Sequence, residues 1–143
     1  MTDPRFNKPL IVAGATLFLL GLLQGAAVQQ FLNPRMALSA HLTAVQSGMA
    51  LMIAGAVWQA VTLPPSLARL CRWALMVSMF ALWSGLTLSA MTGASVSLPI
   101  AGSGFSATPG MELFVSALVL GSSGVMVLGW GLLVIGLVRW RPT

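Results

Sequence analysis

The stretch Asn33-Pro34-Arg35-Met36-Ala37-Leu38-Ser39-Ala40-His41 joins two long apolar segments and holds the only histidine of the chain. Asn33 is a favourable N-cap residue, and Pro34 suits the first position of a helix because the N–H that proline lacks has no intrahelical partner there. We therefore expect a helix to begin at residue 34. At a rise of about 1.5 Å per residue, His41 lies about 12 Å along the helix axis from Asn33.

The composition excludes an ordinary soluble protein. Of the 143 residues, 57% are hydrophobic and 6% are charged, whereas globular domains carry roughly a quarter of charged residues. The net charge of +5 does not indicate a nucleic-acid partner, because the Lys and Arg residues lie in pairs at segment ends and no nucleic-acid motif is present. The composition predicts an integral membrane protein, with residues 1–143 as a single domain.

Four apolar segments predict an all-α, four-helix transmembrane bundle. The expected helices cover residues 8–32, 34–62, 66–91 and 109–138, and each is long enough to cross a hydrocarbon core of about 30 Å. Pro64-Pro65 ends the second segment, and Thr108-Pro109 begins the fourth. Residues 92–108 are rich in Gly, Ser, Thr and Pro, so we expect an exterior loop there, because irregular backbone is not tolerated against lipid.

Charges at the segment ends predict the orientation. One end carries six basic residues and the other carries Arg35 alone; the six are Arg5, Lys8, Arg69, Arg72, Arg139 and Arg141. Positive residues accumulate on the cytoplasmic side of membrane proteins. We therefore expect both termini in the cytoplasm (N-in, C-in) of a multi-pass protein in a bacterial-type inner (plasma) membrane.

His41 is a candidate metal ligand, because ionisable side chains at membrane depth are costly and usually functional. The antiparallel segment before Asn33 sets Gly25 and Gln24 beside it, and Gln24 is the expected hydrogen-bond partner of the second imidazole nitrogen. Ala44 and Gly48 are small enough to let a flat ring lie against the helix. An alternative stays open on the residues alone, namely that His41 is a hydrogen-bonded residue of a helix interface.

Further polar residues belong to the same end of the bundle. Gln46 and Ser47 follow His41 closely in the sequence. Arg35 is either an interfacial anchor or the partner of a haem propionate, since a guanidinium matches carboxylate geometry. Glu112, in the first turn of the last segment, either stabilises the helix dipole or acts in proton transfer.

The motifs around His41 resemble a known family. Asn33-Pro34-Arg35-Met36, Leu38-Ser39-Ala40-His41-Leu42 and Gly48-Met49 are similar to hydroxylaminobenzene mutases, and the resemblance covers the whole chain. Ala40-His41 with Gly48-Met49 also resembles, more distantly, the styrene oxide isomerases. Those isomerases are trimeric four-helix membrane proteins that bind haem b through this histidine, with the haem between neighbouring subunits.

The resemblance implies a mutase that rearranges hydroxylaminobenzene to 2-aminophenol, a reaction that fits nitroaromatic degradation. It implies that His41 is the axial ligand of haem b in a homotrimer, with the iron as a Lewis acid on the N–OH group. Gln24, Arg35, Ala44 and Gly48 would line the cofactor. Glu112 would move a proton or stabilise a cation, and Gln46 or Ser47 would orient the amine.

The chain departs from the isomerase pattern at two points, which disfavours epoxide isomerisation as the alternative activity. Ser47 stands where the isomerases have asparagine, and the chain has no tyrosine. Two non-enzymatic alternatives are also less favoured. A small proton-coupled exporter needs a carboxylate in mid-membrane, whereas Glu112 opens a helix. A haem-anchor subunit with six-coordinate iron commonly uses two ligands, and one histidine is present.

Overall fold

The computed structural model describes residues 6–140, and this part of the chain is all-helical, as predicted. Its elements are α1 (Lys8–Ala26), η1 (Val28–Gln30), α2 (Pro34–Ala56), η2 (Trp58–Ala60), α3 (Pro65–Thr92) and α4 (Pro109–Val138). The four α-helices are each long and apolar enough to cross a membrane. Arg5 and Arg141, which contributed to the predicted orientation, lie outside the described residues.

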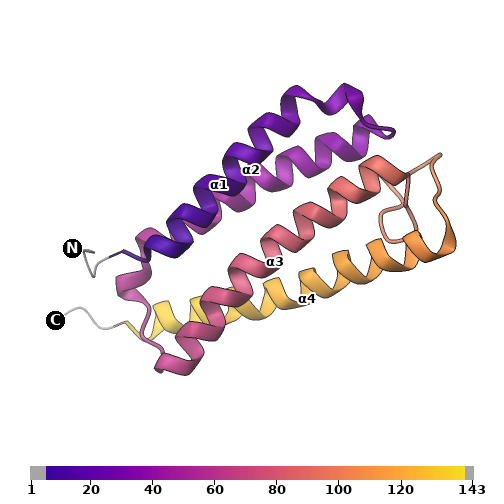
Figure 1. Ribbon diagram of the computed structural model, residues 1–143. Coiled ribbons are helices and arrows are strands. Elements are labelled where there is room, and N and C mark those ends of the chain that lie inside the picture. Colours follow the sequence, from indigo (N-terminus) through magenta and orange to yellow (C-terminus); the bar gives the residue numbers. More distant parts are fainter. Residues whose placement is uncertain (1–5, 141–143) are drawn as a thin grey trace.

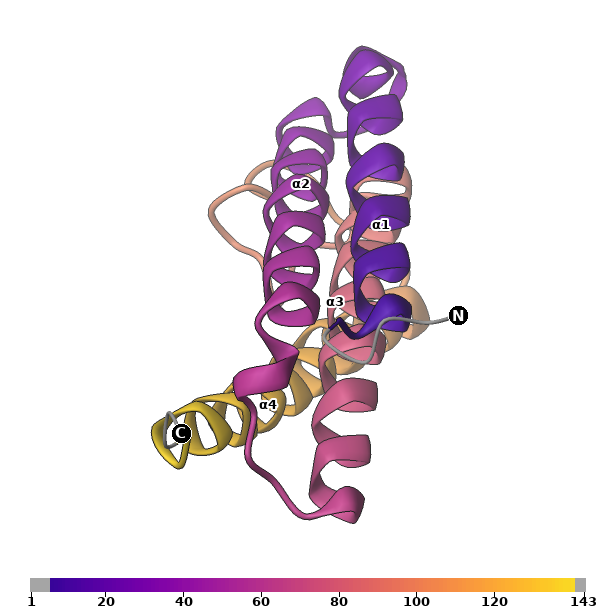
Figure 2. The same cartoon turned by 90° about the vertical axis from the view of Figure 1, so that its left-hand side faces the viewer.

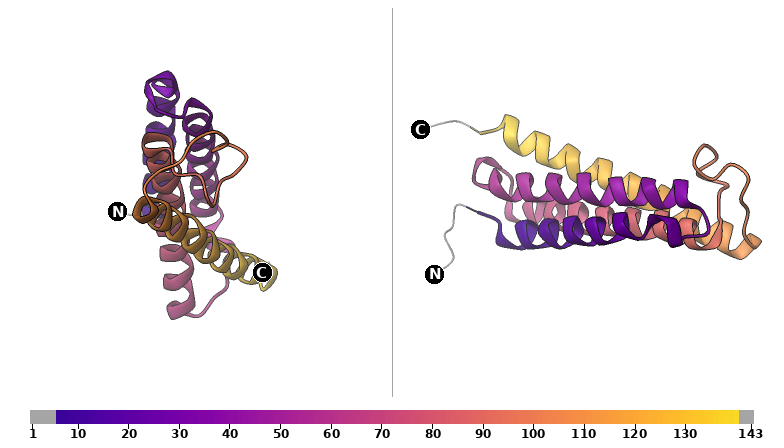
Figure 3. Two further views of the ribbon diagram at one scale, coloured as in Figure 1. Left: turned by 90° about the vertical axis from the view of Figure 1, so that its right-hand side faces the viewer. Right: turned by 90° about the horizontal axis from the view of Figure 1, so that it is seen from above.

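The helices form two antiparallel hairpins, α1–α2 and α3–α4 (Figure 1). α2 also packs along α3, whereas α1 makes few direct contacts with α3, and α4 packs almost entirely on α3. α4 runs obliquely to the first hairpin (Figure 2). Both ends of the described chain lie at one end of the molecule, and the loop between α3 and α4 lies at the other (Figure 3).

Two helices end earlier than we expected. α1 ends at Ala26 and α2 at Ala56, where the prediction ran to residues 32 and 62. Each is followed by a short 3₁₀ turn, η1 or η2. Each turn contains glutamine but lies between apolar residues, and the predicted helices ran through both, because hydropathy averaged over a span does not detect the tighter hydrogen bonding that ends the α-helix.

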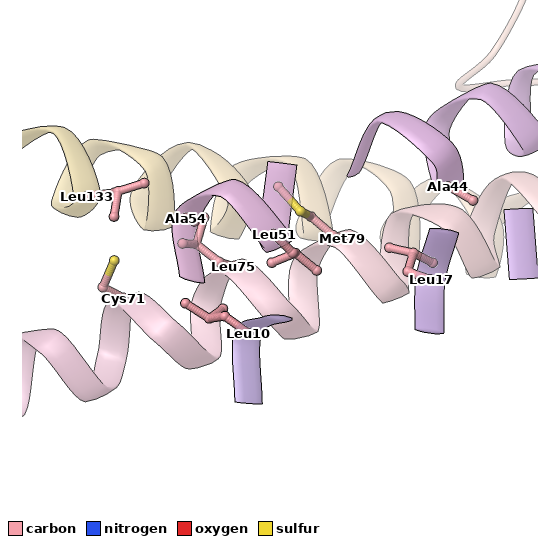
Figure 4. Packing of buried hydrophobic residues seen from close by; sticks show 9 residues of the cluster. All are labelled: Leu10, Leu17, Ala44, Leu51, Ala54, Cys71, Leu75, Met79 and Leu133. Atoms are coloured by element: carbon pink, nitrogen blue, oxygen red, sulfur yellow. The ribbon is translucent and has the colours of Figure 1, made fainter. Parts of the chain in front are cut away.

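The main core cluster lies toward the end of the molecule that carries both termini, and it draws on all four helices (Figure 4). Its members are Leu10, Leu17, Ala44, Leu51, Ala54, Cys71, Leu75, Met79 and Leu133. Within the first hairpin, backbone packs directly on backbone. A Cβ added at Gly14 would lie 2.6 Å from the carbonyl oxygen of Gly48, and one added at Gly48 would lie 2.6 Å from the amide nitrogen of Phe18. Small residues allow this approach, which drives helix association in membranes.

Candidate functional site

Asn33 fixes the start of α2 at the predicted position. Its side-chain oxygen accepts a hydrogen bond from the N–H of Met36 at 3.1 Å, as an N-cap does. Its own N–H donates to the carbonyl of Ala90 at 3.0 Å, and its amide nitrogen donates to the carbonyl of Ala101 at 3.0 Å. Asn33 is 1% exposed. The first turn of α2 is thereby tied to the end of α3 and to the loop, and this sets the position of His41 two turns further on.

The half-buried imidazole of His41 lies against α1. Its Nδ1 is 2.7 Å from the carbonyl oxygen of Gly21. A Cβ added at Gly25 would lie 2.7 Å from both Nδ1 and Cε1 of the ring, so the ring occupies space that only glycine leaves free. The expected placement of Gly25 beside His41 is confirmed.

This hydrogen bond determines the tautomer of a neutral His41. A carbonyl oxygen can only accept, so Nδ1 must carry the proton, and the lone pair then lies on Nε2. Nε2 makes no hydrogen bond within residues 6–140. A bond from Nδ1–H to a backbone carbonyl is the usual outer contact of a histidine that ligates a metal through Nε2.

Gln24 does not pair with His41, and this expectation was wrong. Its Oε1 accepts a hydrogen bond from Nε1 of Trp83 at 2.6 Å, and its Nε2 donates to Oγ1 of Thr87 at 3.1 Å. Equal distance from the Asn33 turn predicted the depth of Gln24 correctly but not its direction. Successive residues of a helix point about 100° apart, so α1 turns Gly25 toward α2 and Gln24 toward α3.

Ala44 and Gly48 are also not free to receive a flat ring. A Cβ added at Gly21 would lie 2.8 Å from Cβ of Ala44, and Gly48 contacts the backbone of α1 at Phe18. The predicted space exists, but α1 occupies it. The sequence shows that residues are small without showing which neighbour approaches them.

Gln46 and Ser47 are not placed beside His41. They follow it by five and six residues, which turns their side chains about 140° and 120° away from it around α2. Gln46 is exposed, whereas Ser47 is 9% exposed and belongs to the buried side of the helix. Their predicted roles in orienting an amine remain predictions without a supporting contact.

Arg35 and Glu112 both bind the loop between α3 and α4. The exposed guanidinium of Arg35 donates to the carbonyl of Ser103. The carboxylate of Glu112 accepts from the N–H groups of Ser95 (2.9 and 3.1 Å), Val96 (3.0 Å) and Ala107 (3.0 Å). These donors have no partner in regular secondary structure, so Glu112 satisfies them in place of water. Its proposed proton-transfer role has no supporting contact with His41.

The described residues contain no group of three or more His, Cys, Asp or Glu that could hold a metal ion. A metal bound at His41 therefore needs its other ligands from a cofactor. Haem meets this requirement, because the porphyrin supplies four nitrogens and the protein supplies one axial histidine.

The fold and the site together define a small four-helix membrane protein with a single, pre-oriented histidine near one end of the bundle. The family model for styrene oxide isomerase matches residues 6–138. The chain belongs to that family, as its motifs suggested.

Two relatives carry more specific names. The chain is 36% identical over 131 residues to hydroxylaminobenzene mutase HabA of Ectopseudomonas oleovorans, which covers 91% of this chain and 97% of the relative. It is 33% identical over 137 residues to hydroxylaminobenzene mutase HabB of the same organism, covering 92% and 84%. No solved structure matches the chain significantly. The protein is thus an enzyme of the isomerase or mutase type.

The sequence reasoning missed Gly21, Trp83 and Thr87. Gly21 could have been found, because it precedes Gly25 by one helical turn and faces the same neighbour. Trp83 and Thr87 are also four residues apart, but no local pattern connects α3 to Gln24 on α1.

Proposed function

We propose that this protein is a haem-dependent membrane mutase that rearranges hydroxylaminobenzene to 2-aminophenol. The observation that carries the proposal is the hydrogen bond of 2.7 Å between Nδ1 of His41 and the Gly21 carbonyl, which leaves Nε2 as a free ligand. The substrate is taken from the relatives, both named hydroxylaminobenzene mutases. Haem b is the cofactor that a single histidine fits.

When bound, the haem iron would supply a Lewis acid for the oxygen of the substrate's N–OH group. His41 would hold the group through Nε2, and the Gly21 carbonyl fixes the direction in which Nε2 points. Leu38 lies three residues before His41 and Val45 four residues after it, so both flank the imidazole on the helix surface. These apolar side chains help to exclude water from a reaction in which positive charge develops on the aromatic amine.

The partial exposure of His41 supports the proposed homotrimer. Neighbouring residues on α2 are exposed in the single chain, Leu38 by 49% and Leu42 by 48%. A haem bound to Nε2 would contact this chain on one side and leave apolar surface on the other. In the proposed homotrimer, which the likeness to the trimeric isomerases implies, a neighbouring subunit would cover that surface in place of lipid, with the haem close to the interface.

The charge distribution supports a bacterial-type inner membrane with both termini in the cytoplasm. α1 and α3 begin, and α4 ends, at the end of the molecule where both ends of the described chain lie, whereas α2 begins at the opposite end (Figure 3). Lys8 opens α1, Arg69 and Arg72 lie in the first turns of α3, Arg139 follows α4, and Arg35 lies in the first turn of α2. The positive-inside rule assigns the first end to the cytoplasm.

Epoxide isomerisation is the second candidate, and the match to the styrene oxide isomerase family model favours it. Both reactions begin by polarising a substrate oxygen, so the same Lewis acid serves either one. An exporter is disfavoured, because the Glu112 carboxylate is engaged by three backbone N–H groups of the loop.

The test uses full-length protein that carries no polyhistidine tag and is purified in detergent. Wild type should show a Soret band and should convert hydroxylaminobenzene to 2-aminophenol, and His41→Ala should lose both. Thr43→Val is the matched control, because it changes a polar residue of the same helix that points about 160° away from His41. An active but colourless wild type would contradict haem dependence, and turnover of styrene oxide alone would select the second candidate.

A further inference from the structure

The polar groups that join α1 to α3 lie beside the two glycines of α1 that contact His41. Gln24 is 7% exposed and sits between Gly21 and Gly25 on α1. Its side chain reaches Trp83 and Thr87 on α3, and neither residue contributes to the imidazole contacts described above. We propose that this cluster, Gln24–Trp83–Thr87, positions α1 so that the Gly21 carbonyl fixes the tautomer and direction of His41.

The cluster is a closed ring of three hydrogen bonds. Trp83 Nε1 donates to Gln24 Oε1 at 2.6 Å, and Gln24 Nε2 donates to Thr87 Oγ1 at 3.1 Å. The Thr87 hydroxyl donates to the backbone carbonyl of Trp83 at 2.9 Å. Each of the three side chains therefore donates one hydrogen bond, and the direction of every bond is defined, because an indole N–H can only donate.

The hydrogen bonds of this ring constrain the rotation of α1 relative to α3. α1 packs closely on α2 but makes few direct contacts with α3, so the bonds of Gln24 are the polar contacts that set which side of α1 faces α3. A helix held only by apolar packing in a bilayer has no hydrophobic drive to keep one orientation. Buried polar groups without partners are costly there, so the ring favours the orientation of α1 in which both bonds of Gln24 to α3 form.

The orientation of α1 affects the position of His41 through two contacts. Gly21 supplies the acceptor for Nδ1, and Gly25 supplies the surface on which the ring lies. A rotation of α1 that broke the Gln24 bonds would move both contacts, because Gly21, Gln24 and Gly25 lie within about one turn of the same helix. Gln24 is thus a positioning residue, which acts on His41 through the backbone of α1.

The proposal rests on the proposed function for its significance, but its primary test needs no haem. His41 is the only histidine, so histidine labelled with ¹⁵N in the full-length apoprotein gives the resonances of one imidazole. In wild type the Nδ1-protonated tautomer should predominate. Thr87→Val keeps the size of the side chain and breaks two bonds of the ring, and Gln24→Leu removes both side-chain bonds of Gln24. Both should convert the spectrum to a mixture of tautomers.

Outer contacts of this kind typically change metal affinity by 10- to 100-fold, so haem affinity in both variants should fall about tenfold. Cys71→Ala is the control, because Cys71 donates across another helix pair, to the Gly129 carbonyl of α4 at 3.4 Å. It should leave the His41 tautomer unchanged even if it lowers the melting temperature. A wild-type tautomer in folded Thr87→Val and Gln24→Leu would overturn the proposal.

The two proposals fail in different ways. If the ring controls the tautomer but the protein binds no haem, the positioning role stands and the proposed function falls. If the protein binds haem and is active, but the tautomer and the haem affinity are unchanged in the Gln24 and Thr87 variants, the positioning role is rejected and the proposed function stands. A shifted tautomer in Cys71→Ala would also overturn it, because any loss of helix packing would then suffice.

Discussion

The two hairpins of this protein are built differently, although both are antiparallel pairs of apolar helices. In α1–α2 the backbones touch through glycine, as at Gly14 and Gly48, and the imidazole of His41 fills the remaining gap at Gly25. In α3–α4 the glycines face side chains: a Cβ added at Gly85 would lie 2.9 Å from a methyl group of Val119, and one added at Gly129 would lie 3.1 Å from the side chain and backbone nitrogen of Leu75. Sites that need exact geometry favour the first arrangement, because backbone contacts cannot relax by changing rotamers.

The glycines of the outer surface of α4 extend this contrast. Gly121, Gly124 and Gly131 have no neighbouring atom within 4 Å of an added Cβ. By contrast, a Cβ added at Gly25 would lie less than 3 Å from the imidazole of His41. Glycine-to-alanine substitutions therefore compare how closely the helices pack in the two hairpins, with the same added methyl group in each.

The largest effect is expected for Gly25→Ala. The new methyl group would lie 2.7 Å from Nδ1 and Cε1 of His41, so the ring must move and its bond to the Gly21 carbonyl must break. Haem affinity should fall about 10- to 100-fold, as for other losses of an outer contact. Titration of the apoprotein with haem measures it. Gly121→Ala is the control and should titrate as wild type, whereas equal losses in both variants would mean that the two hairpins do not differ at this level.

A smaller effect, on folding, is expected for Gly14→Ala. Its methyl group would meet the carbonyl oxygen of Gly48 at 2.6 Å and the amide nitrogen of Met52 at 2.8 Å, and neither backbone atom can move without separating the helices. Overpacking of this kind costs about 1–3 kcal/mol. Unfolding in mixed micelles should show a loss in this range. Gly129→Ala should cost less, because its nearest contacts are 3.1 Å away, and the reverse order would contradict the contrast.

Glu112→Gln should have a local effect on the second hairpin. A glutamine amide offers one acceptor oxygen where the carboxylate offers two for three N–H donors. The loss of a charged acceptor from these bonds should weaken them and loosen the loop at residues 93–108. Limited proteolysis should cut this loop faster, while turnover per bound haem stays near wild type. A large fall in turnover per haem, with the loop still protected, would instead restore Glu112 as a proton-transfer residue.

The smallest effect is expected for Gln46→Leu. Gln46 is exposed and points about 140° away from His41 around α2. Its replacement should change kcat and KM for hydroxylaminobenzene less than about twofold, because only interactions with the reacting groups alter transition-state binding. A large rise in KM would show that the substrate reaches this side of α2.

These differences also explain how far the sequence predicts the site. The Asn33-Pro34 cap, the four spans and the proximity of Gly25 to His41 follow from local rules, because caps, hydropathy and depth across a short turn are properties of one or two adjacent segments. Gln24 illustrates the limit. Depth placed it near His41, but its direction depends on where α3 packs, and α3 is distant in the sequence.

Glu112 and Ala44 show the same limit. An acidic residue in the first turn of a helix satisfies the dipole rule wherever its carboxylate points, so the loop amides that it binds could not be predicted. Ala44 was correctly identified as small, but the helix that fills the space beside it became visible only in the assembled hairpin. In both residues the missing information was tertiary.

The central claim is that Nε2 of His41 is the ligand of the cofactor, and replacing the side chain by a free ligand tests it most directly. His41→Gly removes the imidazole and leaves a gap beside Gly25. The account predicts that this variant binds haem weakly and has no mutase activity, and that added imidazole restores both. A His41→Gly variant that keeps haem and activity without imidazole would contradict it.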